Sequence, residues 1–320
     1  MSDKRPWIYG ALGAAVATAA TVVAVTVLSD SDDTPVAGSG DPAPSASSDL
    51  AEPSGSPEPS ESAETSETAD PEPSGSAVVS GTVPVYLVGS TGRGLGLYRE
   101  FQAGEGDDPL LSAVGASLSG ASLDPDYSSL WEGLGAQVDA APPAGDVILL
   151  ALSGSGPDLA ERPDGMSAAD ARLAVQQLVW TATAALQRDV PVTFEVDGDA
   201  PDTLLGVDVT GGVSRGEAMS TLAPVWVTSP QDGDTVGSTF AVEGQGAFFE
   251  ATVSWQLLDP PGEVVKEGFT TARECCVMSP YRFQVKDVDP GDYTLRVYQA
   301  DTSGEPGAVE TEDTKRLTVE

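Results

Sequence analysis

Histidine is absent from this chain of 320 residues, and basic residues and cysteines are scarce. Without histidine the chain cannot form a Ser-His-Asp triad, a Cys-His pair, a His-Glu-x-x-His zinc site or a histidine proton shuttle. The 15 Lys and Arg residues stand against 50 Asp and Glu residues, which gives a formal net charge of −35. Because phosphate binding needs clustered Lys and Arg, nucleic acid is not an expected partner. Carboxylate-only or lysine-based chemistry remains possible, but the absence of histidine argues against an enzyme.

One long run without charge occupies residues 7–28, WIYGALGAAVATAATVVAVTVL. At about 1.5 Å per residue, a helix of this length extends roughly 33 Å, enough to cross a bilayer core of about 30 Å. Lys4 and Arg5 precede the run and Asp30 follows it, so we expect residues 1–6 to be cytoplasmic. A cleaved signal peptide is the alternative, but the run exceeds the h-region length of about 7–15 residues. We therefore expect a single-pass protein of the cell membrane with extracytoplasmic C-terminal domains.

Residues 29–77 are dominated by Pro, Ser, Glu, Gly and Ala, with no aromatic residue and only acidic charges. Such a segment cannot bury enough apolar surface to offset its ordering entropy. Proline and charge repulsion favour an extended chain. We predict a disordered linker that holds the following domains away from the membrane.

Two strand patterns and a helix pattern begin the next region. Residues 83–89, VPVYLVG, and 97–102, LYREFQ, predict a β-hairpin. The glycines between them do not fit G-x-G-x-x-G and lead to a strand, so a phosphate-binding loop is not indicated. Asp108 and Pro109 are typical of an N-cap and the first position of a helix, and Gly120 suits its end.

A second helix has the clearest start signal in the chain. Ser167 and Asp170 form a capping-box pattern before AADARLAVQQLVWTATAALQ. Residues 147–152, VILLAL, and 192–196 predict strands on either side of this helix. The order of elements predicts an α/β (or α+β) domain over residues 78–222.

From residue 224 the pattern changes to short strands separated by turns. Val253, Trp255 and Leu257 alternate with polar residues, and Tyr293 follows a Pro-Gly turn in the manner of a tyrosine corner. We predict an immunoglobulin-like β-sandwich over residues 224–320, packed around Trp255. Its seven predicted strands are 225–228, 239–243, 251–258, 264–271, 281–285, 293–299 and 316–319.

Both regions resemble known families. VPVYLVG, LYREFQ, LAVQQLVWTAT and VPVTFEVDG, within residues 83–215, resemble a GerMN domain of the sporulation and spore germination type. WVTSPQDGDTV, FAVEGQGAFFEATVSWQLLD, SPYRF and DPGDYTLRVYQADTSG, within residues 225–319, resemble the immunoglobulin-like domain of bacterial spore germination. The resemblance implies a non-enzymatic, envelope-exposed module of a Gram-positive (actinobacterial-type) bacterium that binds protein or wall components. It supplies no catalytic, cofactor or metal residues.

The adjacent Cys275 and Cys276 are the only cysteines. An oxidising compartment favours a disulfide, and adjacent residues can close only a tight ring. A vicinal disulfide, a bond to another chain and two free thiols all remain open, and we favour the first. Zinc is not expected from two thiols without histidine.

Three further patterns have ordinary explanations. Gly212-Val-Ser214-Arg-Gly216 matches G-x-S-x-G, but no histidine can activate the serine. Two acidic groups lack the spacing of a calcium loop and suit turns between strands; they are Asp287, Asp289 and Asp292, and Glu195, Asp197 and Asp199. The aromatic candidates for ligand contact, most of them expected in the core, are Tyr98, Trp131, Trp226, Phe248 and Phe249.

These observations favour a membrane-anchored, non-catalytic binding or scaffold protein of the cell envelope that engages protein partners and needs no cofactor. A module that binds peptidoglycan or another wall glycan is the second hypothesis. A hydrolase that uses Ser214 or a carboxylate pair is the third.

Overall fold

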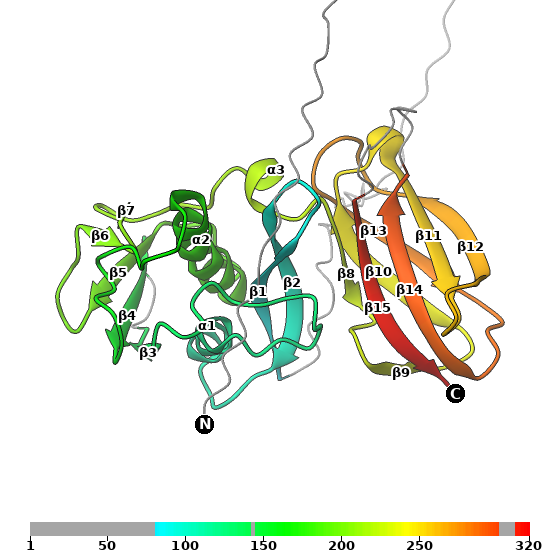
Figure 1. Ribbon diagram of the computed structural model, residues 1–320, viewed down its shortest axis with the longest axis horizontal. Helices are drawn as coiled ribbons and strands as arrows, with labels where there is room; N and C mark the ends of the chain where they lie inside the picture. The colour runs from blue at the N-terminus through cyan, green and yellow to red at the C-terminus, as the bar shows by residue number, and fades with distance from the viewer. Residues whose placement is uncertain (1–80, 142–144, 301–310) are drawn as a thin grey trace, which may run out of the picture. The chain divides into compact units, whose positions relative to one another are not determined.

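The structure, a computed structural model, describes residues 81–141, 145–300 and 311–320 (Figure 1). These residues belong to one compact unit. The predicted membrane span at 7–28 and the predicted linker at 29–77 lie outside the described residues. Within the described ranges, no helix has the length and apolar character needed to cross a membrane.

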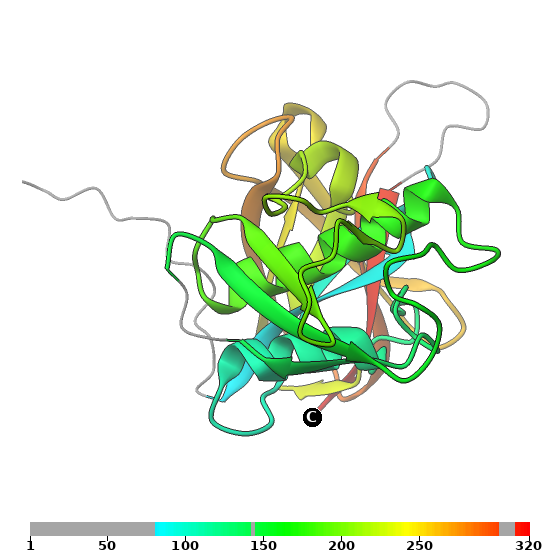
Figure 2. The same ribbon diagram turned by 90° about the vertical axis from the view of Figure 1, so that its left-hand side faces the viewer.

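The first region has three layers, with two helices in the middle. β1 (Thr82–Ser90) and β2 (Leu95–Ala103) form an antiparallel hairpin on one side of α1 (Pro109–Ser119) and α2 (Ala168–Ala185). A sheet of order β3-β4-β5 lies on the other side, with β4 and β5 parallel (Figures 1 and 2). The remaining elements are β3 (Ala136–Ala140), β4 (Ile148–Gly154), β5 (Val192–Val196), β6 (Thr203–Leu204), β7 (Val207–Asp208) and α3 (Ala218–Thr221).

Both long helices begin as the sequence predicts. The Asp108 carboxylate accepts hydrogen bonds from the first-turn amides of α1, and Gly120 ends this helix at φ 75°. Ser167 and Asp170 form the reciprocal capping box of α2. Because α2 lies between two sheets, it is buried on more than one face, and Leu178 and Trp180 belong to different hydrophobic clusters.

The second region is a β-sandwich of two sheets. One sheet has the order β13-β10-β8 and the other the order β12-β11-β14-β15-β9. Val253, Leu257 and Val297 are buried between the sheets, whereas Trp255 is only half-buried and stacks on Phe283. The strands are β8 (Val225–Ser229), β9 (Asp234–Val236), β10 (Phe240–Gly246), β11 (Thr252–Leu258), β12 (Val264–Thr271), β13 (Ser279–Val285), β14 (Gly291–Gln299) and β15 (Thr311–Val319); a short 3-10 helix spans Phe249–Ala251.

The structure adds strands that the sequence did not predict. β3 was missed because its side chains are half-buried or exposed and two of its three apolar residues are alanines, which are depleted in strands. β9 was missed because it has three residues and pairs in parallel with the distant β15. β15 begins at Thr311, well before the predicted start at residue 316, and the added residues include two buried charges.

Candidate functional site

The G-x-S-x-G segment lies in a loop that packs against α2. The backbone oxygen of Ser214 accepts a hydrogen bond from Gln176 Nε2 at 3.1 Å, and the Gly216 amide donates to Gln176 Oε1 at 2.6 Å. The α3 helix that follows has only four residues. A hollow of about 430 Å³ beside α2 is lined by Gln176, Gly216 and Glu217 but not by Ser214. The segment therefore closes a loop onto α2 and lacks the geometry of a nucleophile elbow.

The two acidic groups lie at strand ends and in the turns beside them, with Asp292 inside β14 and Glu195 inside β5. The backbone oxygen of Asp289 accepts a hydrogen bond from the Tyr293 hydroxyl at 3.0 Å, and Asp292 accepts one from Thr318 at 2.9 Å. In the second group, the Asp199 amide bonds the Val196 oxygen within a tight turn after β5. Within the described part of the chain, no three His, Cys, Asp or Glu residues lie close enough together to hold a metal ion.

Cys275 and Cys276 are joined to each other by a disulfide in the loop between β12 and β13. Both residues are exposed, and Cys276 has a left-handed backbone with φ 66°. The Cys276 amide donates to the backbone oxygen of Phe248 at 3.0 Å. This contact ties the disulfide loop to the turn that precedes β11.

Most of the aromatic candidates are in the hydrophobic interior. Tyr98, Trp131, Trp226 and Phe248 are buried, whereas Phe249 is 56% exposed. Trp226 belongs to β8 of the sandwich, yet it packs in the cluster built mainly from the β1–β2 hairpin. This packing identifies the junction of the two regions as the place where their cores meet.

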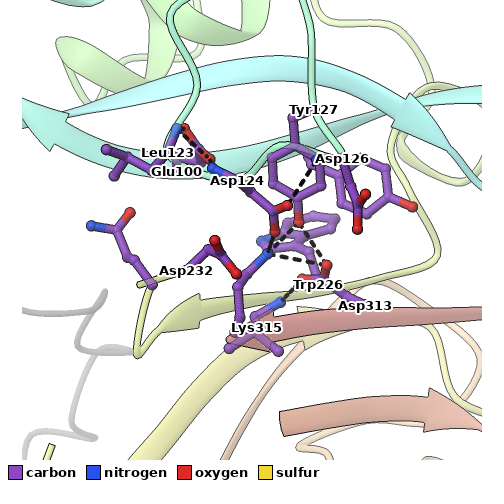
Figure 3. A network of polar contacts seen from close by, with 12 residues as sticks. Glu100, Leu123, Asp124, Asp126, Tyr127, Trp226, Asp232, Asp313 and Lys315 are labelled. Carbon is purple, nitrogen blue, oxygen red and sulfur yellow. Dashed lines mark hydrogen bonds and ion pairs between the residues drawn. The ribbon is translucent and has the colours of Figure 1, made fainter. Parts of the chain in front are cut away.

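A buried ionic network occupies this junction (Figure 3). Lys315 Nζ of β15 lies 2.5 Å from the Asp124 carboxylate, in the loop after α1, and 3.1 Å from the Asp313 carboxylate. The Tyr127 hydroxyl accepts from Lys315 at 2.6 Å and donates to Asp313 at 2.7 Å. The side chains of Lys315, Asp124 and Asp313 are at most 4% exposed. We call Asp124, Tyr127, Asp313 and Lys315 the junction network.

Backbone and side-chain groups from both regions complete its hydrogen bonds. The Val227 amide of β8 donates to Asp313 at 2.6 Å. The buried Glu100 carboxylate of β2 accepts from the Leu123 and Asp124 amides, at distances from 2.8 to 3.2 Å, and so positions the loop that carries Asp124. Burial of an unpaired charge is strongly unfavourable. The hydrogen bonds and ion pairs of the network offset this cost for each of its charged groups.

The network also controls how its members ionise. Burial raises the pKa of the Asp313 carboxyl, although Lys315 acts in the opposite direction. Burial lowers the pKa of the Lys315 ammonium, but Asp313 and Asp124 outweigh this effect and leave its pKa above the usual value. Burial and the Asp313 carboxylate raise the pKa of the Tyr127 phenol well above its usual range. A protonated lysine and a neutral phenol are therefore fixed in place and closed to solvent.

Two further contacts join the same regions. The Gln231 side chain bonds both backbone groups of Phe101, accepting from its amide at 2.8 Å and donating to its oxygen at 2.6 Å. The Ala223 amide donates to the Leu97 oxygen at 2.9 Å. Both contacts lie along β2, whose backbone on this side would otherwise have no strand as partner. Together with the junction network, they make the junction a continuous polar and apolar interface.

Sequence reasoning missed the junction network, although β15 contains a signal for it. Asp313, Lys315, Leu317 and Val319 alternate along the strand and are all buried. Charged residues are almost never fully buried unless they are paired. Two charged residues at inward positions of a strand therefore indicate that oppositely charged or polar groups from another part of the chain cover them. The charged groups of the network bond one another across the two regions. The network therefore acts as a contact between domains.

The comparisons with known proteins agree on two domains. Residues 84–202 match the model of the family described as sporulation and spore germination, and residues 224–305 match that of the immunoglobulin-like domain of bacterial spore germination. A search of curated proteins found no match.

Three solved structures align with this chain at low TM-scores. The tandem GerMN domains of the sporulation protein GerM from Bacillus subtilis align with 15% identity and a TM-score of 0.28, over 46% of this chain and 51% of that chain. CopC from Methylosinus trichosporium OB3b aligns with 20% identity and a TM-score of 0.23, over 30% of this chain and 92% of that chain. A Jonesia denitrificans lytic polysaccharide monooxygenase aligns with 10% identity and a TM-score of 0.22, over 28% of this chain and 60% of that chain.

Proposed function

Because the chain carries a sporulation and spore germination (GerMN) domain followed by the immunoglobulin-like domain of bacterial spore germination, we propose that it is a non-catalytic scaffold of the cell envelope. In this proposal residues 7–28 anchor it in the cell membrane, and both domains lie on the extracytoplasmic side, where they engage envelope proteins. Neither family is known as an enzyme family.

The observation that carries the proposal is the junction network. Lys315 and Asp313 of the sandwich are completely enclosed with Asp124 and Tyr127 of the GerMN domain. Separation of the domains would expose Trp226 to water and would break the hydrogen bonds of the junction network, so the two domains keep one relative orientation. Fixed geometry between two binding domains suits a scaffold, which must hold its partners at set positions.

The arrangement of ionisable groups supports a non-catalytic role. General acid–base catalysis needs a titratable group within reach of a substrate. Lys315 and Asp313 have shifted pKa values, but their side chains are at most 4% exposed and contact each other. Ser214 contacts α2 through its backbone oxygen, which accepts from Gln176.

Affinity capture of the full-length protein from cross-linked cells tests the scaffold proposal. We expect one dominant envelope protein in near-equal amount. A capture that yields no protein partner would contradict the proposal. So would turnover of ester, glycoside or peptide substrates by the purified chain, if the Ser214→Ala variant lost that turnover. A Ser220→Ala variant, changed at an exposed serine of the same segment, is the matched control.

Cell fractionation tests the anchor. We expect the chain in the membrane fraction, released by detergent but not by high salt, with both domains digested by protease added outside the cytoplasmic membrane. A mature N-terminus beyond residue 28 together with a freely soluble chain would show that residues 7–28 are a cleaved signal peptide.

A further inference from the structure

The outer face of the five-stranded sheet, on the side away from the sandwich core, carries two aromatic side chains in one row. In the register of the sheet, Ser254 of β11 lies opposite Phe269 of β12 and opposite Tyr298 of β14. Directly opposed residues point to the same face of an antiparallel sheet, so Phe269, Ser254 and Tyr298 stand side by side. Phe269 is 78% exposed, the highest value among the exposed large hydrophobic residues of the described chain.

The small side chain of Ser254 leaves a slot between the two aromatic residues. Neighbouring strands lie about 4.8 Å apart, which places the backbones that carry Phe269 and Tyr298 about 10 Å from each other. The space between the two side chains, with a serine hydroxyl at its base, suits one pyranose ring, which has C–H groups on its faces and hydroxyls at its edge. The electron-rich faces of Phe269, and the face of Tyr298 that Arg296 does not cover, can receive the C–H groups of such a ring.

The polar side chains beside the slot are held in fixed positions. Arg296 of β14 lies 4.3 Å from the ring centre of Tyr298, 2.5 Å from Glu312 and 3.1 Å from Gln256 Oε1. Gln256 lies opposite Arg296 in the register, in the row next to the slot. A guanidinium, an amide and a carboxylate that are already oriented can donate to and accept from the hydroxyls of a ligand at little entropic cost.

Both arginines named on this face are paired with carboxylates, and the acidic Glu267 and Asp292 share the face with them. Arg296 is paired with Glu312, and Arg316 of β15 is paired with Asp232 at 2.5 Å. An anionic polymer would be repelled by the net charge of −35, whereas an uncharged one would not. The face therefore suits a neutral, hydroxyl-rich ligand.

The same face continues into a hollow at its other end. Thr294 lies opposite Arg316 and Asp292 opposite Thr318, so these residues share the face of Tyr298. They line a hollow of about 350 Å³ together with Pro260 of the β11–β12 turn. From Asp292 to Tyr298, β14 spans about 20 Å at roughly 3.4 Å per residue. The face is long enough for several sugar rings of a linear polymer.

We propose that the outer face of the five-stranded sheet binds an extended, uncharged glycan strand, with one sugar ring held between Phe269 and Tyr298. The strand follows β14 past Arg296 toward the hollow at Thr294. The inference rests on the proposed function of an envelope binding protein and adds a ligand class and a surface to it.

Binding of defined glycans to the purified full chain in detergent tests this inference. The probes are the hexamer of N-acetylglucosamine, cellohexaose and purified wall sacculi, measured by calorimetry for the soluble sugars and by co-sedimentation for the sacculi. We expect at least one of the three probes to bind. A preference for the acetylated hexamer and sacculi over cellohexaose would assign the ligand to wall glycan.

Filling the slot provides the sharpest variant. Ser254→Trp should weaken binding about tenfold or more, because the new indole occupies the position of the sugar ring. Gln284→Trp is the matched control, since Gln284 is exposed on β13 of the opposite sheet. This variant adds the same side chain elsewhere and should bind as the unmodified chain does.

A second variant, which removes an aromatic side chain, tests the glycan site even if Ser254→Trp does not fold. Phe269→Ala removes a side chain that is already 78% exposed, so folding should persist while binding falls roughly tenfold. Phe249→Ala, at an exposed phenylalanine in the turn before β11, should bind normally.

Two results would overturn the glycan inference. They are the failure of all three probes to bind the full chain, and binding that survives both Ser254→Trp and Phe269→Ala. If the chain captures an envelope protein from cross-linked cells but binds no glycan, the scaffold proposal stands and this inference falls. If the chain binds sacculi through Phe269 but captures no protein, the glycan inference stands and the proposal of a protein scaffold falls.

Discussion

Strand β15 carries charged side chains on both of its faces, in opposite environments. Asp313 and Lys315 point inward and are buried at the junction, whereas Glu312 and Arg316 point outward. The Glu312 side chain is 43% exposed and lies 2.5 Å from Arg296. The Arg316 side chain is 65% exposed, but its partner Asp232 at 2.5 Å is only 4% exposed, so the Glu312 pair is the exposed one. Burial distinguishes the two sets more clearly than ion-pair distance does.

The difference shows that equal geometry does not mean equal energy. Water screens an exposed ion pair and solvates either partner when the other is removed, so such pairs contribute about 0–1 kcal/mol. A buried charge has no such replacement, and loss of its partner costs about 3–5 kcal/mol. The inner face of β15 should therefore dominate the coupling of the two domains, and the outer face should be free to change or to bind a ligand.

Replacement of Lys315 by methionine should have the largest effect. Lys315→Met leaves the Asp124 and Asp313 carboxylates buried side by side without a cation, which should lower the free energy of unfolding by about 3–5 kcal/mol. Urea unfolding of the full chain, followed by tryptophan fluorescence, measures this loss. Glu312→Met, at a charge that is 43% exposed on the outer face of the same strand, should lose much less. Equal losses in the two variants would contradict the comparison.

The same variant tests whether the domains unfold together. Trp131 lies in the core of the GerMN domain and Trp255 in the sandwich. In the unmodified chain we expect one cooperative transition, because neither domain can separate without exposing the junction network. In Lys315→Met the two fluorescence contributions should separate into two transitions. Two transitions in the unmodified chain would show that the junction does not couple the domains.

Alkaline pH should also destabilise the buried groups of the junction, together with Tyr98 and Tyr281, whose pKa values are raised by burial as well. The pKa values of Lys315 and Tyr127 are raised in the folded chain, so their contribution to stability is complete below the unfolded values of about 10 and is lost as pH rises through the folded values. Each proton lost only by the unfolded chain costs about 1.4 kcal/mol per pH unit. Unfolding free energies between pH 9 and 11 measure the slope.

Removal of one of these titrating groups tests the assignment. Tyr127→Phe should reduce the alkaline slope, because the variant lacks one proton that the folded chain retains. Tyr298→Phe, on the outer face of β14, changes a half-buried tyrosine outside the junction and serves as the comparison. If the dependence of unfolding free energy on pH were unchanged in Tyr127→Phe, the Tyr127 phenol would not contribute to the alkaline loss of stability.

Local signals in the sequence were sufficient for the helices and the long strands. Asp108, Ser167 and Asp170 mark helix starts through hydrogen bonds to amides within three residues, so their role depends on the nearby chain alone. Val253 and Leu257 mark a strand by alternation, and both are buried as predicted. These interactions are short-range, and the sequence contains all of their partners in one window.

The junction could not be predicted in the same way. Lys315 and Asp124 are 191 positions apart, and the Gln231 contact with Phe101 spans 130. No local pattern encodes which loop covers the inward charges of β15, because that choice depends on how two complete domains pack. Trp226 illustrates the same limit, since its apolar character predicts burial but not burial in the core of the other domain.

Removal of the Gln231 side chain should have an intermediate effect. Gln231→Ala leaves the partly buried amide and oxygen of Phe101 without their side-chain partner, which should cost about 1–2 kcal/mol. The denaturation midpoint of the full chain measures this cost. Gln284→Ala, at an exposed glutamine of β13, is the matched control and should leave the midpoint unchanged. A loss as large as that in Lys315→Met would mean that hydrogen bonds along β2, and not the ionic network, dominate the junction.

The smallest effect is expected on the outer face of β15. Glu312→Gln breaks the ion pair with Arg296 but keeps the size and an acceptor oxygen, so the free energy of unfolding should change by about 0–1 kcal/mol. In 1 M salt the difference in unfolding free energy between this variant and the unmodified chain should be smaller still, because salt screens exposed ion pairs. The same variant frees Arg296 from one of its fixed partners beside Tyr298. Glu312→Gln should therefore weaken glycan binding more than it lowers the free energy of unfolding. A loss of stability near that of Lys315→Met would contradict the difference in energy between the inner and outer faces of β15.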